Sequence, residues 1–205
     1  MDRDDWNARY SGTEMVWSVT PNRFVAEETA TLAPGRALDL ACGEGRNAVW
    51  LAEQGWSVVA VDFADAAIAT GRRLAAERGV EVGWLVDDIT AHQPEPGGFD
   101  LVLLCYVHLP EPARHALMAA ARTAVAPGGT FLLVGHDRSN IEHGHGGPQD
   151  PAVLCTPADV VADLPGFEVL RAEVVERPVA LDAGHGGPAE AVALDTLVRA
   201  VRPPG

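Results

Sequence analysis

The amino-acid sequence predicts an α/β fold, with a mostly parallel β-sheet and helices on both of its faces. Short apolar runs, several of them rich in β-branched residues, alternate along the chain with segments of helical length. Strands that alternate with helices pair in parallel, because each crossover returns the chain to the same end of the sheet. The last two apolar runs have no helical pattern between them, so we expect this final pair to be antiparallel.

Five βα-type units followed by a β-hairpin make up the expected order. The strands are expected at residues 37–41, 56–61, 82–86, 99–107, 130–134, 167–175 and 191–201. The helices are expected at residues 43–54, 65–79, 111–126 and 156–164. Gly55 and Gly79 end the first two helices, while Asp65 and Thr156 are the expected N-caps of the second and fourth. A loop rich in Gly, His and Pro occupies residues 136–156 and is expected on the substrate side.

Residues 1–33 differ from the rest of the chain. They carry aromatic side chains among polar residues and a Pro21-Asn22 turn, so we expect short helices or loops. The regular pattern starts after Pro34-Gly35. The chain has the length of one ordinary domain and no solenoid-type repeat. We therefore expect a single domain over residues 1–205, with a core at 34–205 and a cap or lid at 1–33.

The charge balance excludes several kinds of chemistry. Acidic residues number 29 against 15 basic ones, which gives a formal net charge of −14, and every basic residue is Arg. A chain without Lys has no Schiff-base lysine and no P-loop lysine. The acidity disfavours nucleic acids and anionic membranes as partners, because phosphate binding needs clustered positive charge. It leaves small molecules open, and we expect a monomer or a homodimer.

The three cysteines, Cys42, Cys105 and Cys155, are few, odd in number and widely spaced. This is neither a disulfide framework nor a zinc pattern, so a reducing cytoplasm is the expected compartment. The first residues are polar and lack the apolar run of a signal peptide. No apolar stretch approaches the length of a membrane span.

The most informative segment is the glycine turn, residues 39–47, which joins the first strand to the first helix. Gly43 and Gly45 allow a tight turn and let a ligand approach the helix N-terminus. In open α/β sheets ligands bind beyond the carboxyl ends of the strands. Asp62 follows Gly43 by roughly 20 residues, at the end of the second strand, where a carboxylate accepts hydrogen bonds from ribose hydroxyls.

Two cofactor classes share this layout. Residues 43–48 also fit the dinucleotide form G-x-G-x-x-A. A dinucleotide would bring a pyrophosphate to a turn flanked by Asp39 and Glu44, which is electrostatically unfavourable, whereas a cationic ligand reverses this relation. Arg46 is compatible with both classes, because it can pair with a ligand carboxylate or with a phosphate.

The run Asp-Leu-Ala-Cys-Gly-Glu-Gly-Arg-Asn over residues 39–47 resembles motif I of the class I S-adenosylmethionine-dependent methyltransferases, written roughly D/E-x-G-x-G-x-G. With Trp6-Asn-Ala-Arg9-Tyr10 near the start, the chain most resembles the small bacterial enzymes of the tellurite-resistance and thiopurine methyltransferase type. The resemblance covers nearly the whole chain. Ala41 departs from it, because the family has its first glycine at that position.

The resemblance implies a Rossmann-like sheet of seven strands whose last strand is antiparallel. It also implies S-adenosylmethionine as the cofactor and S-adenosylhomocysteine as its product. By resemblance, Asp39 holds the methionine amino end, the Gly43–Gly45 backbone passes beneath the cofactor, and Asp62 holds the ribose hydroxyls. The remaining cofactor contacts expected from position are those of Ala41, Arg46, Phe63 beside the adenine, Asp88 at the exocyclic amine, Ile89 through its backbone, and Cys105.

Three residues near the carboxyl ends of the fourth and fifth strands are candidates for the chemistry. Methyl transfer is an in-line displacement that needs a proton acceptor only when the nucleophile is protonated. His108 and His136 are the candidate bases, because histidine titrates near neutral pH. Tyr106 is expected to shape the substrate pocket. For each of them a purely structural role remains open, as a helix cap or a packed side chain.

The N-terminal aromatic residues form a candidate lid. Arg9, Tyr10 and Trp17 are placed to close over the site, as the N-terminal segment does in the resembling family. The alternative is a segment packed on the edge of the sheet with an exposed Arg.

The pentapeptide Gly-His-Gly-Gly-Pro occurs twice, at residues 144–148 and 184–188. Histidine-rich tracts can bind metal, but Gly-Gly-Pro is also ordinary turn chemistry, and methyl transfer of this class requires no metal. We therefore expect no metal site.

Together these patterns favour a methyltransferase that acts by direct displacement on a small-molecule nucleophile of the thiol, phenol, halide or oxyanion class. A nicotinamide-dependent oxidoreductase, a non-catalytic cofactor-binding protein and a metal-binding protein are the alternatives.

Overall fold

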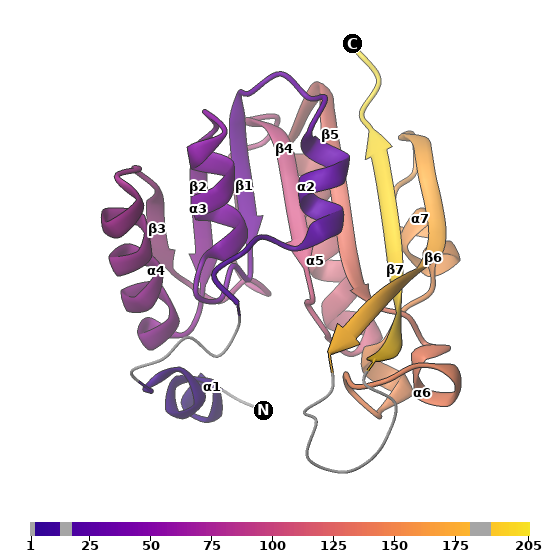
Figure 1. Ribbon diagram of the computed structural model, residues 1–205. Coiled ribbons are helices and arrows are strands. Elements are labelled where there is room, and N and C mark those ends of the chain that lie inside the picture. The colour runs from indigo at the N-terminus through magenta and orange to yellow at the C-terminus, as the bar shows by residue number, and fades with distance from the viewer. Residues whose placement is uncertain (1–2, 13–17, 181–189) are drawn as a thin grey trace.

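The computed structural model describes residues 3–12, 18–180 and 190–205, which form one seven-stranded sheet in the order β3-β2-β1-β4-β5-β7-β6 (Figure 1). The strands are β1 (Arg36–Leu40), β2 (Ser57–Asp62), β3 (Gly83–Val86), β4 (Phe99–Cys105), β5 (Val125–His136), β6 (Glu168–Ala180) and β7 (Glu190–Val201). Neighbouring strands pair in parallel from β3 through β5, and β7 is antiparallel to both β5 and β6. The predicted fold class and the antiparallel hairpin are therefore confirmed.

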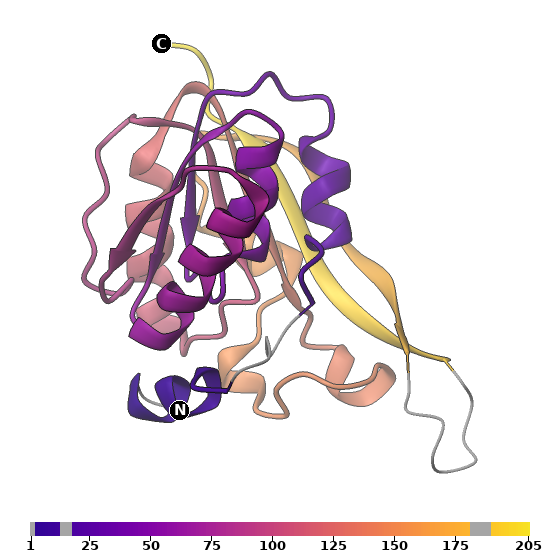
Figure 2. The same ribbon diagram turned by 60° about the vertical axis from the view of Figure 1, so that its left-hand side comes forward.

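Helices cover both faces of this sheet, as Figures 1 and 2 show from two directions. They are α1 (Arg3–Tyr10), α2 (Arg23–Thr29), α3 (Arg46–Glu53), α4 (Asp65–Arg78), α5 (Glu111–Ala124), α6 (Asn140–His143) and α7 (Pro157–Ala162), with a 3-10 turn, η1, at Pro151–Val153. Helices α2, α3 and α4 pack on one face, and α5 and α7 pack on the other.

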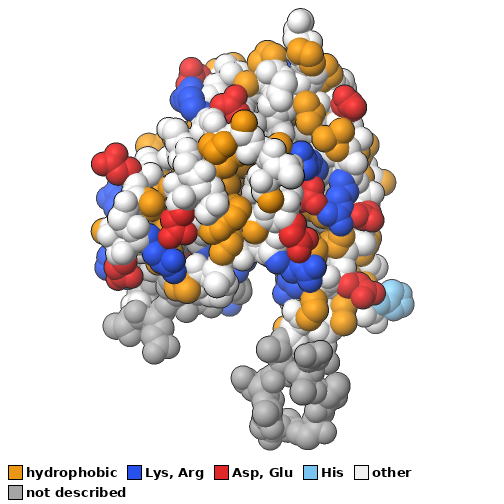
Figure 3. Space-filling view, turned by 45° about the horizontal axis from the view of Figure 1, so that its top comes forward, with side chains coloured by type: hydrophobic (Ala, Val, Ile, Leu, Met, Phe, Trp, Pro, Cys, Tyr) orange, Lys and Arg blue, Asp and Glu red, His pale blue; other side chains and the backbone are white. Residues whose placement is uncertain are grey.

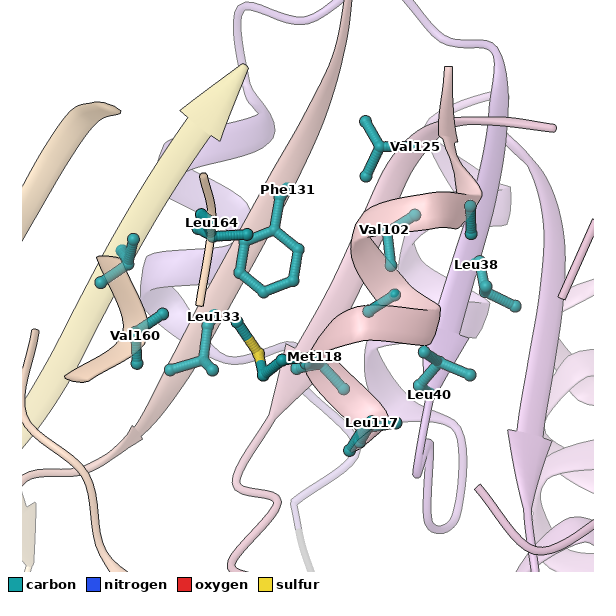
Figure 4. Close-up of a cluster of buried hydrophobic side chains, with 14 of the residues drawn as sticks. Leu38, Leu40, Val102, Leu117, Met118, Val125, Phe131, Leu133, Val160 and Leu164 are labelled. Atoms are coloured by element: carbon teal, nitrogen blue, oxygen red, sulfur yellow. The ribbon is translucent and has the colours of Figure 1, made fainter. Parts of the chain in front are cut away.

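The strict alternation of strand side chains divides the core between these two faces. On the α5–α7 face, Phe131 and Leu133 of β5 pack with Met118 of α5 and Val160 of α7 (Figure 4). Leu132, the residue between them on β5, points to the opposite face, where it joins the cluster lined by α2 and α3. This alternation also decides the side of the sheet on which polar residues at strand ends lie.

An ion cluster fixes α2 on the sheet near the hairpin. The carboxylate of Glu28 pairs with Arg171 of β6 and with Arg199 of β7, and only 8% of Glu28 is exposed. On the face drawn in Figure 3, basic side chains lie among acidic ones. The ion pairs of the described surface include Arg23–Glu27 and Arg78–Glu53. The excess of negative charge is thus interrupted by local pairs over the part of the surface that the structure describes.

Several predicted boundaries are wrong. α3 begins at Arg46 and not at Gly43, because Gly43 and Gly45 both have left-handed backbone angles. β4 ends at Cys105, two residues early, because Tyr106 also adopts a positive φ. β5 begins at Val125 and includes the Pro-Gly-Gly turn. The pairing of β5 with β4 shifts register at this turn. β6 begins one residue later than predicted, at Glu168, and ends five residues later, at Ala180.

The predicted series of five βα-type units is also wrong, because residues 87–98 between β3 and β4 form turns and no helix. The expected loop at residues 136–156 contains the short helix α6 and the 3-10 turn η1. Asp65 is the first residue of α4 and not its N-cap, which is Ala64. Thr156 caps α7 as predicted, in a capping box with Asp159. Within the described residues, no helix is both long and apolar enough to cross a membrane.

Candidate active site

The carboxyl ends of the parallel strands bring most of the predicted site residues to one edge of the sheet. β1 leads there into the glycine turn, β2 ends at Asp62, β4 at Cys105 and β5 at His136. Ala41 and Tyr106, the two non-glycine residues with positive φ among those described, both lie at this edge, each with φ 58°. Backbone strain of this kind persists where the surrounding structure over-determines it, as happens at functional sites.

Asp62 ties the glycine turn to the end of β2. One oxygen of its carboxylate accepts the N–H of Gly43 at 2.8 Å, and the other accepts the N–H of Ala64 at 2.9 Å. Only 4% of Asp62 is exposed, and burial raises the pKa of its carboxyl while these N–H bonds lower it in part. Asp62 therefore holds the turn in shape, in addition to the ribose contact that the sequence predicts for it.

The two glycines of the turn are required for different reasons. A Cβ on Gly45 would lie 2.3 Å from the ring of Trp84 on β3, and a Cβ on Gly71 of α4 would lie 2.6 Å from the same ring. Trp84 is thus wedged between α4 and the turn. A Cβ on Gly43 would lie 3.3 Å from the hydroxyl oxygen of Tyr10. Among the described residues, Tyr10 alone comes within 4 Å of the Cβ position on Gly43, whereas Gly45 is constrained by packing against Trp84.

Asp39 is the most unusual carboxyl of the site. It is 1% exposed, its Oδ2 has no hydrogen-bond partner, and the N–H of Ala48 in α3 donates to its carboxylate. Burial, and then the nearby charge of Asp62, raise the pKa of Asp39 to about 8. A buried carboxyl with an unsatisfied oxygen fits a cationic group such as an ammonium and repels a pyrophosphate. The carboxyl of Asp39 therefore fits the ammonium group of S-adenosylmethionine.

Ala41 stands in a conformation that glycine adopts at no steric cost, so we expect Ala41→Gly to stabilise the protein. A left-handed backbone costs an L-residue about 1–2 kcal/mol, which Ala41→Gly would remove. The greater freedom of glycine in the unfolded chain offsets about 0.5–1 kcal/mol of this gain. Urea denaturation should show a gain of up to about 1 kcal/mol. Ala69→Gly on the exposed side of α4 is the control and should lose about 0.5–1 kcal/mol. An equal loss in both variants would contradict the strain at Ala41.

Helix α1 places Tyr10 beside the glycine turn. The helix packs on α4 through an ion pair of Arg3 with Asp65 at 2.9 Å and a hydrogen bond from the N–H of Ala66 to the side chain of Asn7 at 3.1 Å. Tyr10 is buried and stacks on Trp6, whereas Arg9 is exposed and its guanidinium lies over the Trp6 ring. Of the expected lid residues, Tyr10 alone is placed against the turn, and Trp17 lies outside the described residues.

The segment after β3 carries the residues expected near the adenine. Asp88 is exposed, and its Oδ1 accepts from the N–H and the hydroxyl of Thr90, which leaves Oδ2 available. Ile89 is buried in the core cluster on the α5–α7 face. Phe63, directly after β2, is half-buried. Asp88 therefore keeps one carboxylate oxygen for the predicted contact, although it also serves as a turn cap.

The end of β4 carries groups that are neutral near pH 7. Burial raises the pKa of the Cys105 thiol to about 12, so this thiol is not a nucleophile. Burial and the neighbouring His136 lower the pKa of His108 to about 4. The backbone N–H of His136 donates to Nε2 of His108 at 3.3 Å, which engages the nitrogen that would otherwise accept a proton.

A buried carboxylate that the sequence analysis missed organises this end of the site. Asp195 of β7 is fully buried, and its Oδ2 accepts from the Tyr106 hydroxyl at 2.6 Å and from Nε of Arg177 at 2.7 Å. Its Oδ1 lies 3.3 Å from Nδ1 of His136, at ion-pair distance and without the alignment of a hydrogen bond. Burial raises the pKa of Asp195, but its contacts with His136, Arg177 and Tyr106 outweigh this and hold it below the ordinary value.

Asn22, also missed from the sequence, connects this group to the glycine turn. Its backbone N–H donates to the side chain of Asn47 in the first turn of α3, at 2.9 Å. Its side-chain amide donates to the Tyr106 hydroxyl at 3.3 Å, while its side-chain oxygen caps α2. The cofactor turn and the Asp195 group are therefore parts of one hydrogen-bonded site. The sequence signals for both residues are modest: a turn Asn before a helix, and a single Asp inside an apolar strand.

Only the first of the two histidine-rich loops lies within the described residues. The first copy, residues 144–148, lies beside His136, and the second copy falls outside the described residues. Within the described part of the chain, no group of three or more His, Cys, Asp or Glu side chains is placed to hold a metal ion.

The fold and the site resemble those of the class I S-adenosylmethionine-dependent methyltransferases. Residues 37–129 match the family model described as "Methyltransferase domain". The ubiquinone biosynthesis O-methyltransferase of Azotobacter vinelandii is 35% identical over 132 residues, which cover 62% of this chain and 56% of that protein. The corresponding protein of Pseudomonas aeruginosa is 34% identical over 134 residues, with the same coverage. The chain spans about half the length of the curated relatives it matches.

Solved structures share the fold at low identity. TehB from Haemophilus influenzae superposes with a TM-score of 0.69 at 16% identity, covering 96% of this chain and 66% of that chain. A protein solved in a study of the conversion of a disulfide bond into a thioacetal group during echinomycin biosynthesis gives 0.76 at 20% identity, covering 98% and 93%. These likenesses confirm the Rossmann-like fold, and the nicotinamide-dependent alternative is not favoured.

Proposed function

We propose that this protein transfers the methyl group of S-adenosylmethionine to a small-molecule nucleophile by direct displacement. The observation that carries the proposal is the buried carboxyl of Asp39, whose Oδ2 has no hydrogen-bond partner, beside the left-handed glycine turn at Gly43 and Gly45. The ammonium group of a ligand would supply the positive partner that Oδ2 of Asp39 lacks. The O-methyltransferase relatives support the same reaction class.

The chain's own residues bind and orient the cofactor, which supplies an activated methyl group when bound. In this proposal Asp39 pairs with the ammonium, Arg46 with the carboxylate, and Asp62 accepts from the ribose hydroxyls while it keeps the turn in shape. Ala41 and the backbone of Gly43 and Gly45 line the floor. Phe63, Asp88, Ile89 and Cys105 complete the pocket around the adenine and the sulfur.

Closure and water exclusion are assigned to the N-terminal cap at residues 1–33, over the core at residues 34–205. Tyr10 lies against the turn at Gly43, and Arg9 and Trp17 remain the other proposed lid residues. Exclusion of water matters because the electrostatic interactions of a closed site are stronger than in solvent. We further propose a cytoplasmic monomer or homodimer that binds no nucleic acid, in keeping with three free cysteines and the acidic charge balance.

Isothermal titration of the protein with S-adenosylhomocysteine and with NAD and NADP tests the proposal. We expect saturable binding of S-adenosylhomocysteine and none of either dinucleotide. Dinucleotide binding without S-adenosylhomocysteine binding would overturn it. S-adenosylhomocysteine formation with thiol, phenol, amine, halide and oxyanion acceptors then separates an enzyme from a non-catalytic cofactor-binding protein.

A further inference from the structure

The first Gly-His-Gly-Gly-Pro loop lies against the candidate base His136. A Cβ built on Gly147 would lie 2.6 Å from Cδ2, 2.7 Å from Cγ and 2.8 Å from Nε2 of the His136 ring. These nearly equal distances place Gly147 over the face of the His136 ring. Gly147 has φ 74°, and so has Gly146, but nothing lies within 4 Å of a Cβ on Gly146.

Asn140 anchors this loop to the strand that carries Asp195. Its side-chain amide donates to the carbonyl oxygen of Gly146 at 2.8 Å, and its side-chain oxygen accepts the N–H of Leu194 at 2.7 Å. Asn140 is 1% exposed, and a Cβ on Gly144 would collide with its side chain. The loop is therefore anchored through Asn140 to β7 at Leu194, next to Asp195.

We propose that Asp195 and the loop at residues 144–148 position His136 as the general base for an acceptor that carries a proton on oxygen or sulfur. This rests on the proposed methyl transfer and names the class of its acceptor, a phenol-type hydroxyl or a thiol. Asp195 faces Nδ1 of His136 and favours the tautomer with the proton on that nitrogen. Nε2 then carries the lone pair, and Gly147 fixes the orientation of the ring.

His136 is the group of this cluster suited to take the proton. The Nε2 of His108 accepts the backbone N–H of His136, and burial of the Tyr106 hydroxyl raises its pKa well above the ordinary value, so Tyr106 remains a donor to Asp195. Arg177 neutralises the charge of Asp195. The His136 ring is faced by the Tyr106 ring at 5.1 Å, the His108 ring at 5.5 Å, and the Asp195 carboxylate.

The proton and electron balance of the step is complete. The acceptor's O–H or S–H proton moves to Nε2 of His136, and the acceptor's freed electron pair forms the bond to the methyl carbon. The bond from that carbon to the sulfonium sulfur breaks, and its electron pair stays on sulfur as a thioether. The resulting imidazolium is paired with Asp195 and later returns its proton to solvent.

A series of substituted phenols with falling pKa tests this role, read out as S-adenosylhomocysteine formed. For a phenol of pKa about 10, we expect His136→Gln to lower kcat by 100-fold or more, as loss of a general base does. For a phenol whose pKa lies well below the assay pH, the loss should shrink to within about threefold, because no proton has to be removed. Asp195→Asn should show the same trend with a smaller loss, and the exposed His143→Gln should match the wild type.

The paired glycines give a second readout that does not remove a charge. Gly147→Ala and Gly146→Ala carry the same backbone cost, but only the former displaces the His136 ring, so only it should lower kcat for the phenol of high pKa. Equal losses across the whole phenol series, or equal effects of the two glycine variants, would overturn the role of His136. Wild-type protein that binds S-adenosylhomocysteine and methylates no phenol or thiol would overturn the acceptor class. Failure to bind S-adenosylhomocysteine would instead overturn the proposed function.

Discussion

Asp39→Asn is expected to weaken the binding of S-adenosylmethionine by roughly 10- to 100-fold while it stabilises the ligand-free protein at alkaline pH. A hydrogen bond between charged groups contributes about 1.5–3 kcal/mol, and each 1.4 kcal/mol is a factor of ten in Kd. The amide of Asn keeps the shape of the carboxyl but cannot ionise, whereas a bound ammonium favours the charged form of Asp39. Binding and stability therefore change in opposite directions.

The stability effect follows from the direction of the pKa shift. Burial raises the pKa of Asp39 from 3.8 to about 8, so between these values the folded protein holds a proton that the unfolded chain has released. Stability of the wild type consequently falls as the pH rises through this window, and the loss is complete above about pH 8. Asn carries no charge at any pH, so its advantage should be absent near pH 4 and largest near pH 9.

Thermal unfolding from pH 4 to 9 and titration calorimetry near pH 7 measure the two effects. For a protein of this size each kcal/mol corresponds to about 2–4 °C in Tm. Glu81→Gln, at an exposed carboxyl just before β3, is the control and should leave Kd unchanged. An Asp39→Asn variant that is less stable than the wild type at pH 9, or that binds the cofactor equally well, would contradict the role given to Asp39.

Gly45→Ala is expected to be among the most destabilising single substitutions in the glycine turn, with a loss of roughly 2–5 kcal/mol. The new Cβ pays the left-handed backbone cost of about 1–2 kcal/mol and an overpacking cost of about 1–3 kcal/mol, because the six-membered ring of Trp84 would lie 2.3 Å away. The ring cannot retreat freely, since Gly71 of α4 bounds it on the other side. The turn or β3 must therefore shift.

Gly79→Ala is the matched control for this substitution. Gly79 has φ 67° at the end of α4, and nothing lies within 4 Å of its Cβ position. Gly79→Ala should therefore lose only the stability that the left-handed backbone costs, about 1–2 kcal/mol. Urea denaturation compares the two, and Trp84→Leu combined with Gly45→Ala should recover part of the loss by relieving the contact. Equal losses at Gly45 and Gly79 would show that Trp84 does not limit the turn.

The topology followed from the sequence because it is encoded in local patterns. The β-branched run at residues 56–61 and the missing crossover between the last two strands predict the parallel and antiparallel pairings, and Thr156-Pro157 predicts the start of α7. The glycine turn could also be predicted from the sequence, because the tight turn requires a left-handed backbone at Gly43.

The acceptor side of the site depended on contacts between residues far apart in the chain. Asp195 lies 89 residues from Tyr106, and nothing near either one in the sequence indicates the hydrogen bond between them. The left-handed backbone of Tyr106 ends β4 early, although the local sequence continues as a strand. The contact of Gly147 with His136 likewise exists only after α6 turns the loop back toward β5. Such contacts are set by tertiary packing, which overrides local preference.

Methyl transfer itself is the most direct test of the account. The purified protein is incubated with S-adenosylmethionine labelled on the methyl group and with a panel of phenol and thiol acceptors. We expect label in the acceptor and an equal amount of S-adenosylhomocysteine. Asp39→Asn should lose both products at a cofactor concentration near the wild-type Kd. S-adenosylmethionine that binds and is never consumed, with any acceptor of the panel, would contradict it.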